Sequence, residues 1–311
     1  MVYENICQLV GGTPLLRLHK LSALYGCRTP VVAKLEGWNP SGSVKDRPAF
    51  FLLQKALEEG VLQRGGAVVE ASGGNSAVSL AMVCAALNLR AILVLPDNME
   101  SFLGPLVRAY GGTVVTTPAK EGMEGAQAKA RQIYEAELPN AYLPLPFEND
   151  GACQAHRLQT GPEILAELPQ VDYFITGVGT GATLTGCGEY LKSRCMDCKV
   201  IAVEPNDSPV LSGGMASAHA IRGIGPGFVP PILNVPLIDE IIRVRTPDAL
   251  ELCQQLCRTE GLLCGISSGA ALAAAVDVAS RPEAQDKTLV AVLPDGGAPY
   301  LLSGLLTLDG A

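Results

Sequence analysis

The chain has little of what a nucleic-acid-binding, secreted or membrane-spanning protein needs. Its 23 lysines and arginines are outnumbered by 31 aspartates and glutamates, the formal net charge is −8, and no basic run occurs. Such a charge balance disfavours nucleic acid and anionic membranes as partners. The first residues, Met1-Val-Tyr-Glu-Asn, lack the basic and apolar parts of a secretory signal. The longest apolar stretch, about 77–87, is too short to span a bilayer and predicts a buried helix. We therefore expect a soluble, cytoplasmic protein.

Patterns of metal ligands are also scarce. Only three histidines occur, and they are scattered along the chain: His19, His156 and His219. We assign them structural or surface positions. Among ten cysteines, the pair Cys195 and Cys198 and the pair Cys253 and Cys257 could together be drawn as a four-thiolate zinc site. Most of the cysteines lie in apolar runs, however, where cysteine behaves as a small hydrophobic residue. We predict no metal site and reduced thiols.

The chain does contain a regular alternation of apolar, β-branched stretches with helical patterns. The predicted strands are Val31–Leu35, Ala67–Glu70, Ala91–Pro96, Thr113–Thr117, Tyr173–Thr176, Val200–Val203 and Leu289–Leu293. The amphipathic segments between them include Ala49–Glu59, Gly122–Glu137 and Ala249–Glu260. This alternation predicts an α/β protein with buried parallel strands. A length of 311 residues suits one large or two moderate domains.

Glycine-rich turns punctuate this pattern. We place four of them after predicted strands, at residues 72–76, 177–183, 265–269 and 294–297. Ligands of open α/β sheets bind at the carboxyl ends of the strands, so these turns are candidate binding elements. The long, irregular connection 206–231 is a further candidate binding segment.

One lysine stands at a predicted helix start. The segment 39–47 reads Asn-Pro-Ser-Gly-Ser-Val-Lys-Asp-Arg, and apolar residues follow Val44 at helical spacing. Lys45 would then lie in the first helical turn, where the helix dipole disfavours a charged ammonium. That position favours the neutral amine that a Schiff base needs. On these residues alone, a lysine that merely lies near a helix start remains an alternative.

The turn 177–186 fits two kinds of ligand. Its backbone N–H groups and threonines could hold a phosphate at the start of a helix. The spacing of Gly177, Gly179 and Ala182 also satisfies the dinucleotide fingerprint, and Glu204 follows where an acid that binds ribose would lie. A dinucleotide-binding domain has no need of Lys45 on a second glycine-rich platform, which favours the simple phosphate.

Seven collinear motifs resemble those of the cysteine synthase group of fold-type II pyridoxal-phosphate enzymes, which includes O-acetylserine sulfhydrylase and cystathionine β-synthase. They are Asn39–Arg47, Ser72–Ser76, Thr160–Ile164, Gly179–Gly186, Glu204-Pro205, Gly223–Phe228 and Gly265–Gly269. The resemblance begins at Gly11 and continues in order to Tyr300, nearly the whole chain. It implies a tryptophan synthase β-like fold with two α/β domains and the cofactor in the cleft between them. The implied domains are a small, mobile one at 36–145 and a large one at 1–35 and 146–311.

The resemblance also implies roles for individual residues. Lys45 matches the Schiff-base lysine, which holds pyridoxal 5'-phosphate and moves the substrate α-proton. Asn75 matches the residue that hydrogen-bonds the cofactor ring oxygen. The phosphate loop corresponds to Gly179, Thr180, Gly181, Ala182 and Thr183. Alanine at position 182 replaces a usual glycine, which is tolerable if φ is negative there. The substrate-binding residues correspond to Ser72, Gly73, Gly74, Ser76, Phe147 and Gly223.

Three positions depart from the family pattern. Gly73 stands where the carboxylate loop usually has serine, and Pro146 stands where a glutamine usually helps to hold the same carboxylate. Proline cannot donate a hydrogen bond. The third is Asp295, which aligns near the pyridine nitrogen of the cofactor, where many cysteine synthases carry serine. Its contact with the cofactor is a prediction.

The expected reaction is β-replacement on an activated L-serine, in which O-acetylserine and sulfide give L-cysteine and acetate. A homodimer is the family expectation, and a serine acetyltransferase is an expected partner protein. The altered carboxylate contacts leave open another donor (O-phosphoserine, serine or cysteine), β-elimination, cystathionine formation, or a cofactor-bound protein without activity. A nicotinamide-dependent oxidoreductase, based on the 177–182 fingerprint, is the remaining alternative.

Overall fold

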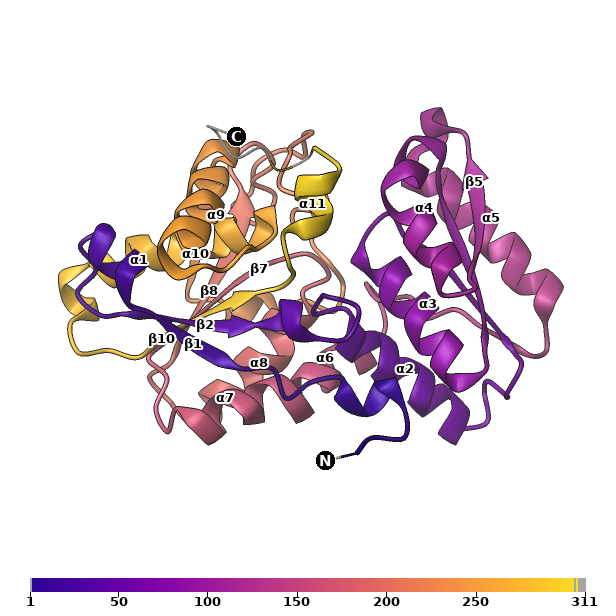
Figure 1. Cartoon of the computed structure of the whole chain (residues 1–311), viewed down its shortest axis with the longest axis horizontal. Helices are drawn as coiled ribbons and strands as arrows, with labels where there is room; N and C mark the ends of the chain where they lie inside the picture. Colours follow the sequence, from indigo (N-terminus) through magenta and orange to yellow (C-terminus); the bar gives the residue numbers. More distant parts are fainter. Residues whose placement is uncertain (1, 305, 307–311) are drawn as a thin grey trace. The chain divides into compact units, whose positions relative to one another are not determined.

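The computed structural model describes residues 2–304 and 306, apart from the side chains of residues 100–103, and divides into two units (Figure 1). Unit 1 consists of Met1–Val10 and Asn39–Ala152, and unit 2 consists of Gly11–Trp38 and Cys153–Ala311. Each unit is built on a mostly parallel sheet covered by helices, which confirms the predicted α/β class. Among the described residues, no helix has the length and apolar character needed to cross a membrane.

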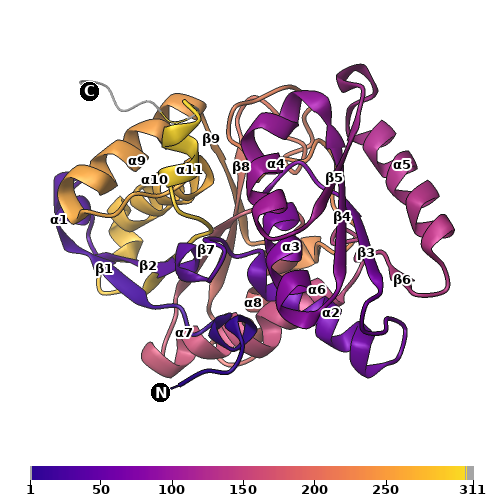
Figure 2. The same ribbon diagram turned by 45° about the vertical axis from the view of Figure 1, so that its right-hand side comes forward.

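Unit 1 has a four-stranded, all-parallel sheet in the order β5-β4-β3-β6. The strands are β3 (Ala67–Ala71), β4 (Arg90–Pro96), β5 (Thr113–Thr117) and β6 (Ala141–Tyr142). The helices are α2 (Asp46–Glu58), α3 (Asn75–Leu87), α4 (Glu100–Ala109) and α5 (Gly122–Glu137), with 3₁₀ turns η1 (Ile6–Leu9), η3 (Asp97–Met99) and η4 (Ala119–Glu121). Because side chains alternate along a strand, Val68 packs with the α2 and α3 side, whereas Val69 packs with Ala126 and Ala130 of α5. Figure 2 shows α3 and α4 on one face of this sheet and α5 on the other.

Unit 2 has a six-stranded sheet in the order β1-β2-β10-β7-β8-β9. The strands are β1 (Leu15–Leu18), β2 (Val31–Leu35), β7 (Tyr173–Gly177), β8 (Lys199–Pro205), β9 (Glu240–Val244) and β10 (Leu289–Leu293). Only β1 among them pairs antiparallel with its neighbour. The helices are α1 (His19–Leu24), α7 (Gly161–Glu167), α8 (Ala182–Lys192), α9 (Thr246–Glu260), α10 (Ile266–Ser280) and α11 (Ala298–Leu302). Helix α6 (Gly151–Ala155) carries the boundary between the units, and shorter turns are η2 (Glu36–Trp38), η5 (His156–Thr160, a π-helical turn), η6 (Val235–Leu237) and η7 (Pro282–Ala284).

The seven predicted strands are all present, and three more occur that the sequence did not indicate: β1, β6 and β9. Strand β6 has only two residues, and β1 and β9 lie at the edges of the unit 2 sheet. Edge strands are half-exposed and therefore lack the continuous apolar run by which buried strands are recognised. The turn 265–269 was expected to follow a strand, but it connects α9 to α10.

Residues 2–10 pack with unit 1, whereas the sequence prediction placed them in the larger domain. Asn5 Nδ2 donates to the Ala86 carbonyl at the end of α3 (3.1 Å). Cys7 is buried in the apolar cluster that includes Leu80 and Cys84 of α3. These contacts hold η1 against α3. The unit boundaries also lie at 38/39 and 152/153, a few residues beyond the predicted 36 and 145.

Candidate active site

Lys45 lies at the start of α2, as the sequence predicts. It is the residue directly before the helix, one position ahead of the first turn to which we assigned it. Its backbone N–H donates to Ser43 Oγ (3.3 Å), and its carbonyl accepts the Ala49 N–H (3.1 Å). The residue is half-buried. The backbone thus fixes the lysine beside the positive end of the α2 dipole.

The loop that carries Lys45 is tied to two helices of unit 1. Asp46, which is buried, accepts hydrogen bonds from the Ser41 N–H (2.7 Å) and from the Ser41 hydroxyl. The Ser41 hydroxyl oxygen also lies 3.1 Å from the Ser79 hydroxyl oxygen on α3. The residues before Lys45 are therefore held by both α2 and α3, so the lysine stem starts from a fixed position.

The predicted carboxylate loop, Ser72–Ser76, joins β3 to α3. Ser72 is buried and its N–H donates to the Val94 carbonyl (3.0 Å), which fixes the start of the loop. Gly74 is the N-cap of α3 in extended geometry (φ −143°), and no side chain caps the helix. Asn75 and Ser76 are the first two residues of the helix. A helix start without a side-chain cap presents N–H groups that suit a carboxylate.

The place of the missing serine side chain at Gly73 is filled by sulfur. A Cβ built on Gly73 would lie 2.4 Å from Met99 Sδ and 3.6 Å from Met123 Sδ. Glycine at this position is therefore matched by Met99, which approaches the loop backbone more closely than any side chain at position 73 would allow.

Pro146 supports a tight turn. The Leu145 carbonyl accepts hydrogen bonds from the N–H groups of Glu148 and Asn149, each at 2.9 Å. Pro146 is thus the second residue of a turn, the position at which the fixed φ of proline is favourable. Asn149 Nδ2 donates to Tyr142 Oη (3.1 Å) and closes the turn against β6. Phe147, the candidate substrate-binding residue, is the third residue of this turn.

The predicted phosphate loop follows β7 in unit 2. A Cβ on Gly179 would lie 2.4 Å from the Gly223 carbonyl oxygen, so only glycine allows this approach of two backbones. Gly181 has φ +87° and is the N-cap of α8, and Thr180 Oγ1 accepts the Ala182 N–H (3.3 Å). Ala182 begins the helix and is not among the residues with positive φ, so alanine fits there as expected.

Gly223 and the start of α10 flank this turn. Gly223 has φ +92°, and a Cβ on it would lie 3.6 Å from Ser267 Oγ. Ser267 is buried at the start of α10 and adds a hydroxyl to this part of the site. The sequence reasoning noted the 265–269 motif but assigned none of its side chains. A Gly-x-Ser-Ser pattern that opens a helix was the available signal.

Asp295 lies just beyond β10 and is buried. Tyr300 Oη donates to its Oδ2 (2.5 Å), and a Cβ on Gly265 would lie 2.2 Å from its Oδ1. Its backbone carbonyl accepts the Gly265 N–H (3.2 Å) and the Ser268 hydroxyl (3.3 Å). Asp295 therefore belongs to the packing of α10 and α11, and its contact with the cofactor stays a prediction.

The competing ligands find less support. Glu204, the residue that a dinucleotide ribose would need, is 2% exposed and accepts the N–H groups of Leu211 (2.8 Å) and Ser212 (3.1 Å) and the Ser212 hydroxyl (2.5 Å). Its carboxylate holds the 206–231 connection. Within residues 2–304 and 306, no group of three or more histidine, cysteine or acidic side chains is placed to hold a metal. All ten cysteines are free, and burial raises the pKa of the Cys198 thiol to about 12.

The unit 2 turn fits a phosphate group. Residues 178–183 contain no acidic side chain, and the turn opens the 11-residue helix α8. The close approach of Gly179 to Gly223 leaves backbone N–H groups and two threonine hydroxyls as its polar groups. N–H groups at a helix start bind dianionic phosphate without a positively charged side chain.

Comparisons with known proteins agree with this geometry. The family model described as pyridoxal-phosphate dependent enzyme matches residues 6–295. The chain is 41% identical over 308 residues to the protein named cysteine synthase in Staphylococcus aureus, with 98% of each chain covered. It is 42% identical over 308 residues to the protein named probable cysteine synthase in Bacillus subtilis, with the same coverage. Among solved structures, it is similar to the cysteine synthase (OASS) of Entamoeba histolytica, with a TM-score of 0.95, 33% identity, and coverage of 100% of this chain and 93% of the other.

Proposed function

The chain belongs to the pyridoxal-phosphate dependent enzymes, and from that premise we propose that it is a cysteine synthase. Acetate leaves the β-carbon of O-acetylserine, and the sulfur of sulfide takes its place to give L-cysteine. The observation that carries this proposal is the position of Lys45, on a loop anchored by Asp46 directly before α2.

Individual residues have proposed tasks toward the cofactor. Bound pyridoxal 5'-phosphate supplies an electron sink that makes the α-proton acidic and the β-substituent a leaving group. Gly179–Thr183 hold its phosphate, and Asn75 and Asp295 are the proposed ring contacts. Lys45 Nζ holds the cofactor and then takes the α-proton from the substrate.

The substrate carboxylate is bound chiefly by backbone. Gly74 and Ser76 offer N–H groups, and Ser72 and Ser76 offer hydroxyls, whereas Gly73 and Pro146 offer no side-chain donor. Two missing charge-assisted hydrogen bonds weaken carboxylate binding by an amount on the order of a few kcal/mol. We expect a raised KM for O-acetylserine as the consequence. Phe147 and Gly223 complete the proposed substrate contacts, and the 36–145 region is the part proposed to close over the substrate.

Assembly and location are part of the same proposal. We expect a homodimer, and a serine acetyltransferase remains the proposed partner protein. The cytoplasmic location inferred from the sequence stays a prediction.

The ultraviolet and visible spectrum tests the function. The purified protein is expected to show the absorption of lysine-bound cofactor, to lose it in Lys45→Ala, and to keep it in the control variant Lys55→Ala, which changes an exposed lysine on the same helix. Addition of O-acetylserine is expected to shift the band, and sulfide is expected to restore it with release of cysteine. An absorption band that does not shift when O-acetylserine is added would point to another donor or to an inactive protein. Absence of the band after addition of pyridoxal 5'-phosphate would contradict the proposal.

A further inference from the structure

A buried histidine contacts the phosphate loop. His156, which is 1% exposed, lies at the start of the π-helical turn His156–Thr160. Its Nδ1 lies 2.9 Å from Thr160 Oγ1, and its Nε2 lies 3.2 Å from Thr183 Oγ1. From the sequence we predicted only a structural or surface position for His156. It now links Thr160, itself buried, to a residue of the candidate phosphate site.

The packing of α8 brings the histidine to this place. A Cβ on Gly186 would lie 2.2 Å from the Cys153 carbonyl oxygen and 2.8 Å from His156 Cβ, so glycine lets the 153–157 backbone touch the helix. Thr183 is three residues before Gly186 and therefore lies on the same face of α8.

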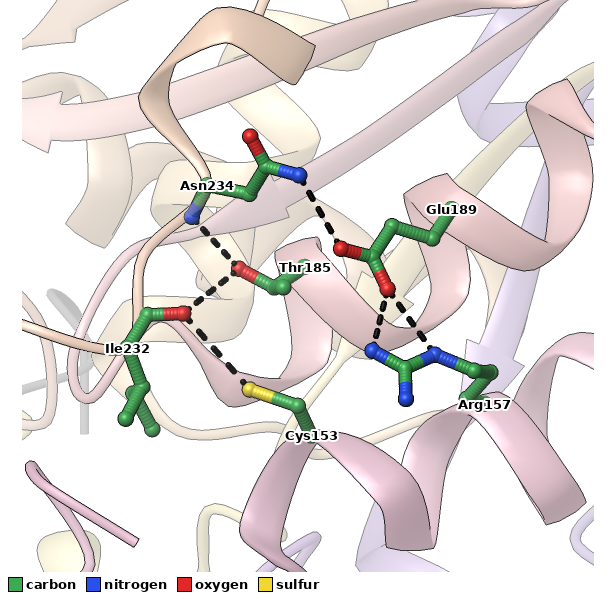
Figure 3. A network of polar contacts seen from close by, with 6 residues as sticks. All are labelled: Cys153, Arg157, Thr185, Glu189, Ile232 and Asn234. Atoms are coloured by element: carbon green, nitrogen blue, oxygen red, sulfur yellow. Dashed lines mark hydrogen bonds and ion pairs between the residues drawn. The ribbon is translucent and has the colours of Figure 1, made fainter. Parts of the chain in front are cut away.

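Other polar contacts of α8 hold the 153–157 segment and the segment 232–234 (Figure 3). Arg157 Nε donates to Glu189 (2.8 Å), and Thr185 Oγ1 donates to the Ile232 carbonyl (3.2 Å) and accepts the Asn234 N–H (3.0 Å). The Arg157 contact therefore holds the segment that carries His156 against α8, the helix that carries Thr183.

The three side chains can share their hydrogens in two directions. A neutral imidazole has one N–H donor and one acceptor, and each threonine hydroxyl has a single hydrogen. If Nδ1 carries the hydrogen, Nε2 accepts from Thr183, and only the lone pairs of Thr183 remain for a neighbouring group. If Nε2 carries the hydrogen, it donates to Thr183 Oγ1, and the Thr183 hydrogen is available to an acceptor.

A phosphate dianion accepts hydrogen bonds and donates none, so it selects the second direction. We propose that His156 is a positioning residue: its Nε2–H donates to Thr183 Oγ1, and the Thr183 hydroxyl thereby donates to the phosphate of the cofactor. This inference rests on the proposed function, since it takes the phosphate to be that of pyridoxal 5'-phosphate. Thr160 completes the chain by donating to Nδ1.

Nuclear magnetic resonance determines which imidazole nitrogen of His156 carries the hydrogen, and it needs no measurement of enzymatic activity. The cofactor-loaded protein is labelled with ¹⁵N-histidine, and only three histidines must be assigned, with His156→Gln as the reference for the missing signal. We expect Nε2 of His156 to carry a hydrogen. An Nε2 without hydrogen in the loaded protein would overturn the proposal.

Cofactor affinity separates positioning from simple packing. Glutamine can place an amide N–H near the Nε2 position, whereas asparagine reaches only as far as Nδ1. We expect His156→Asn to weaken binding of pyridoxal 5'-phosphate to the apoprotein by about tenfold or more, and His156→Gln to keep most of the affinity. Binding of pyridoxal, which lacks the phosphate, is expected to be the same in both variants.

A matched background completes the test. In Thr183→Val, which has no hydroxyl, His156→Asn is expected to cause no further loss of affinity for pyridoxal 5'-phosphate. An equal loss for pyridoxal, or an undiminished loss in the Thr183→Val background, would show a merely structural role and overturn the proposal. Failure of the wild-type protein to bind either compound would instead contradict the proposed function, and the two failures are thereby distinguished.

Discussion

Glu70 is the buried acid whose titration the structure predicts most directly. It lies on β3, two residues before the carboxylate loop, and is 5% exposed. Burial raises the pKa of its carboxyl from 4.5 to about 8, and a hydrogen bond from the Leu145 backbone lowers it in part. The folded protein therefore keeps Glu70 protonated at neutral pH.

The sign of the resulting pH dependence follows from proton linkage. Between pH 4.5 and 8 the folded state holds one proton more than the unfolded state at this site, so unfolding releases a proton. Stability contributed by Glu70 is complete below pH 4.5 and is lost as the pH rises toward 8. One proton corresponds to about 1.4 kcal/mol per pH unit, so the free energy of unfolding should fall by about 2 kcal/mol over roughly 1.5 units around neutrality.

Denaturant unfolding, followed by circular dichroism at a series of pH values, measures this slope. Glu70→Gln is neutral, keeps an oxygen for the Leu145 N–H, and is expected to remove the slope while raising stability above pH 8. The matched control is Glu135→Gln on α5, which is exposed and should leave the slope unchanged. An equal slope in wild-type and Glu70→Gln protein would refute the reasoning, because Glu70 would then contribute nothing to the slope.

Three other perturbations have defined outcomes. Gly179→Ala places a Cβ 2.4 Å from the Gly223 carbonyl oxygen and is expected to lower affinity for pyridoxal 5'-phosphate at least about tenfold, whereas Gly296→Ala, with no atom within 4 Å, should not destabilise the fold. Gly73→Ser should displace the flexible Met99 side chain and lower thermal stability by about 1 kcal/mol, and Met99→Ala should relieve the loss in the double variant. Lys34 is 1% exposed and lies 2.6 Å from Glu163, so Lys34→Met should destabilise the protein by about 3 kcal/mol, as seen in chemical denaturation. Wild-type cofactor affinity in Gly179→Ala, wild-type stability in Gly73→Ser, or wild-type stability in Lys34→Met would contradict the corresponding contact.

Buried elements were predictable because their residues carry a continuous signal. The fully buried strands β2 and β10 have the bounds that the sequence predicts, and so do the β-branched edge strand β5 and the amphipathic helix α5. Strand β9, Glu-Ile-Ile-Arg-Val, was not predicted because its two charged residues interrupt the apolar run. Those residues are compatible with the partial exposure of the strand. A local pattern of apolar residues predicts burial well, but it does not predict which partly exposed segments pair as edge strands.

Within the site, turns and helix starts were predictable and side-chain partners were not. Lys45 and Gly181 lie where the spacing of glycine and apolar residues places them. The role of Met99 beside Gly73 depends on a contact between segments 26 positions apart, which no local pattern encodes. The contact between His156 and Thr160 was not predicted either, although the two residues lie one helical turn apart.

The ten free thiols allow local unfolding of the protein to be followed by alkylation. Eight are buried, and they are divided unequally, with only Cys7 and Cys84 in unit 1 and the others in unit 2. Burial raises the pKa of Cys84 to about 12, so this thiol becomes available to an alkylating reagent only when the surrounding structure opens. Timed alkylation followed by peptide mass mapping therefore yields a separate opening rate for each unit from a single unlabelled, unmutated sample.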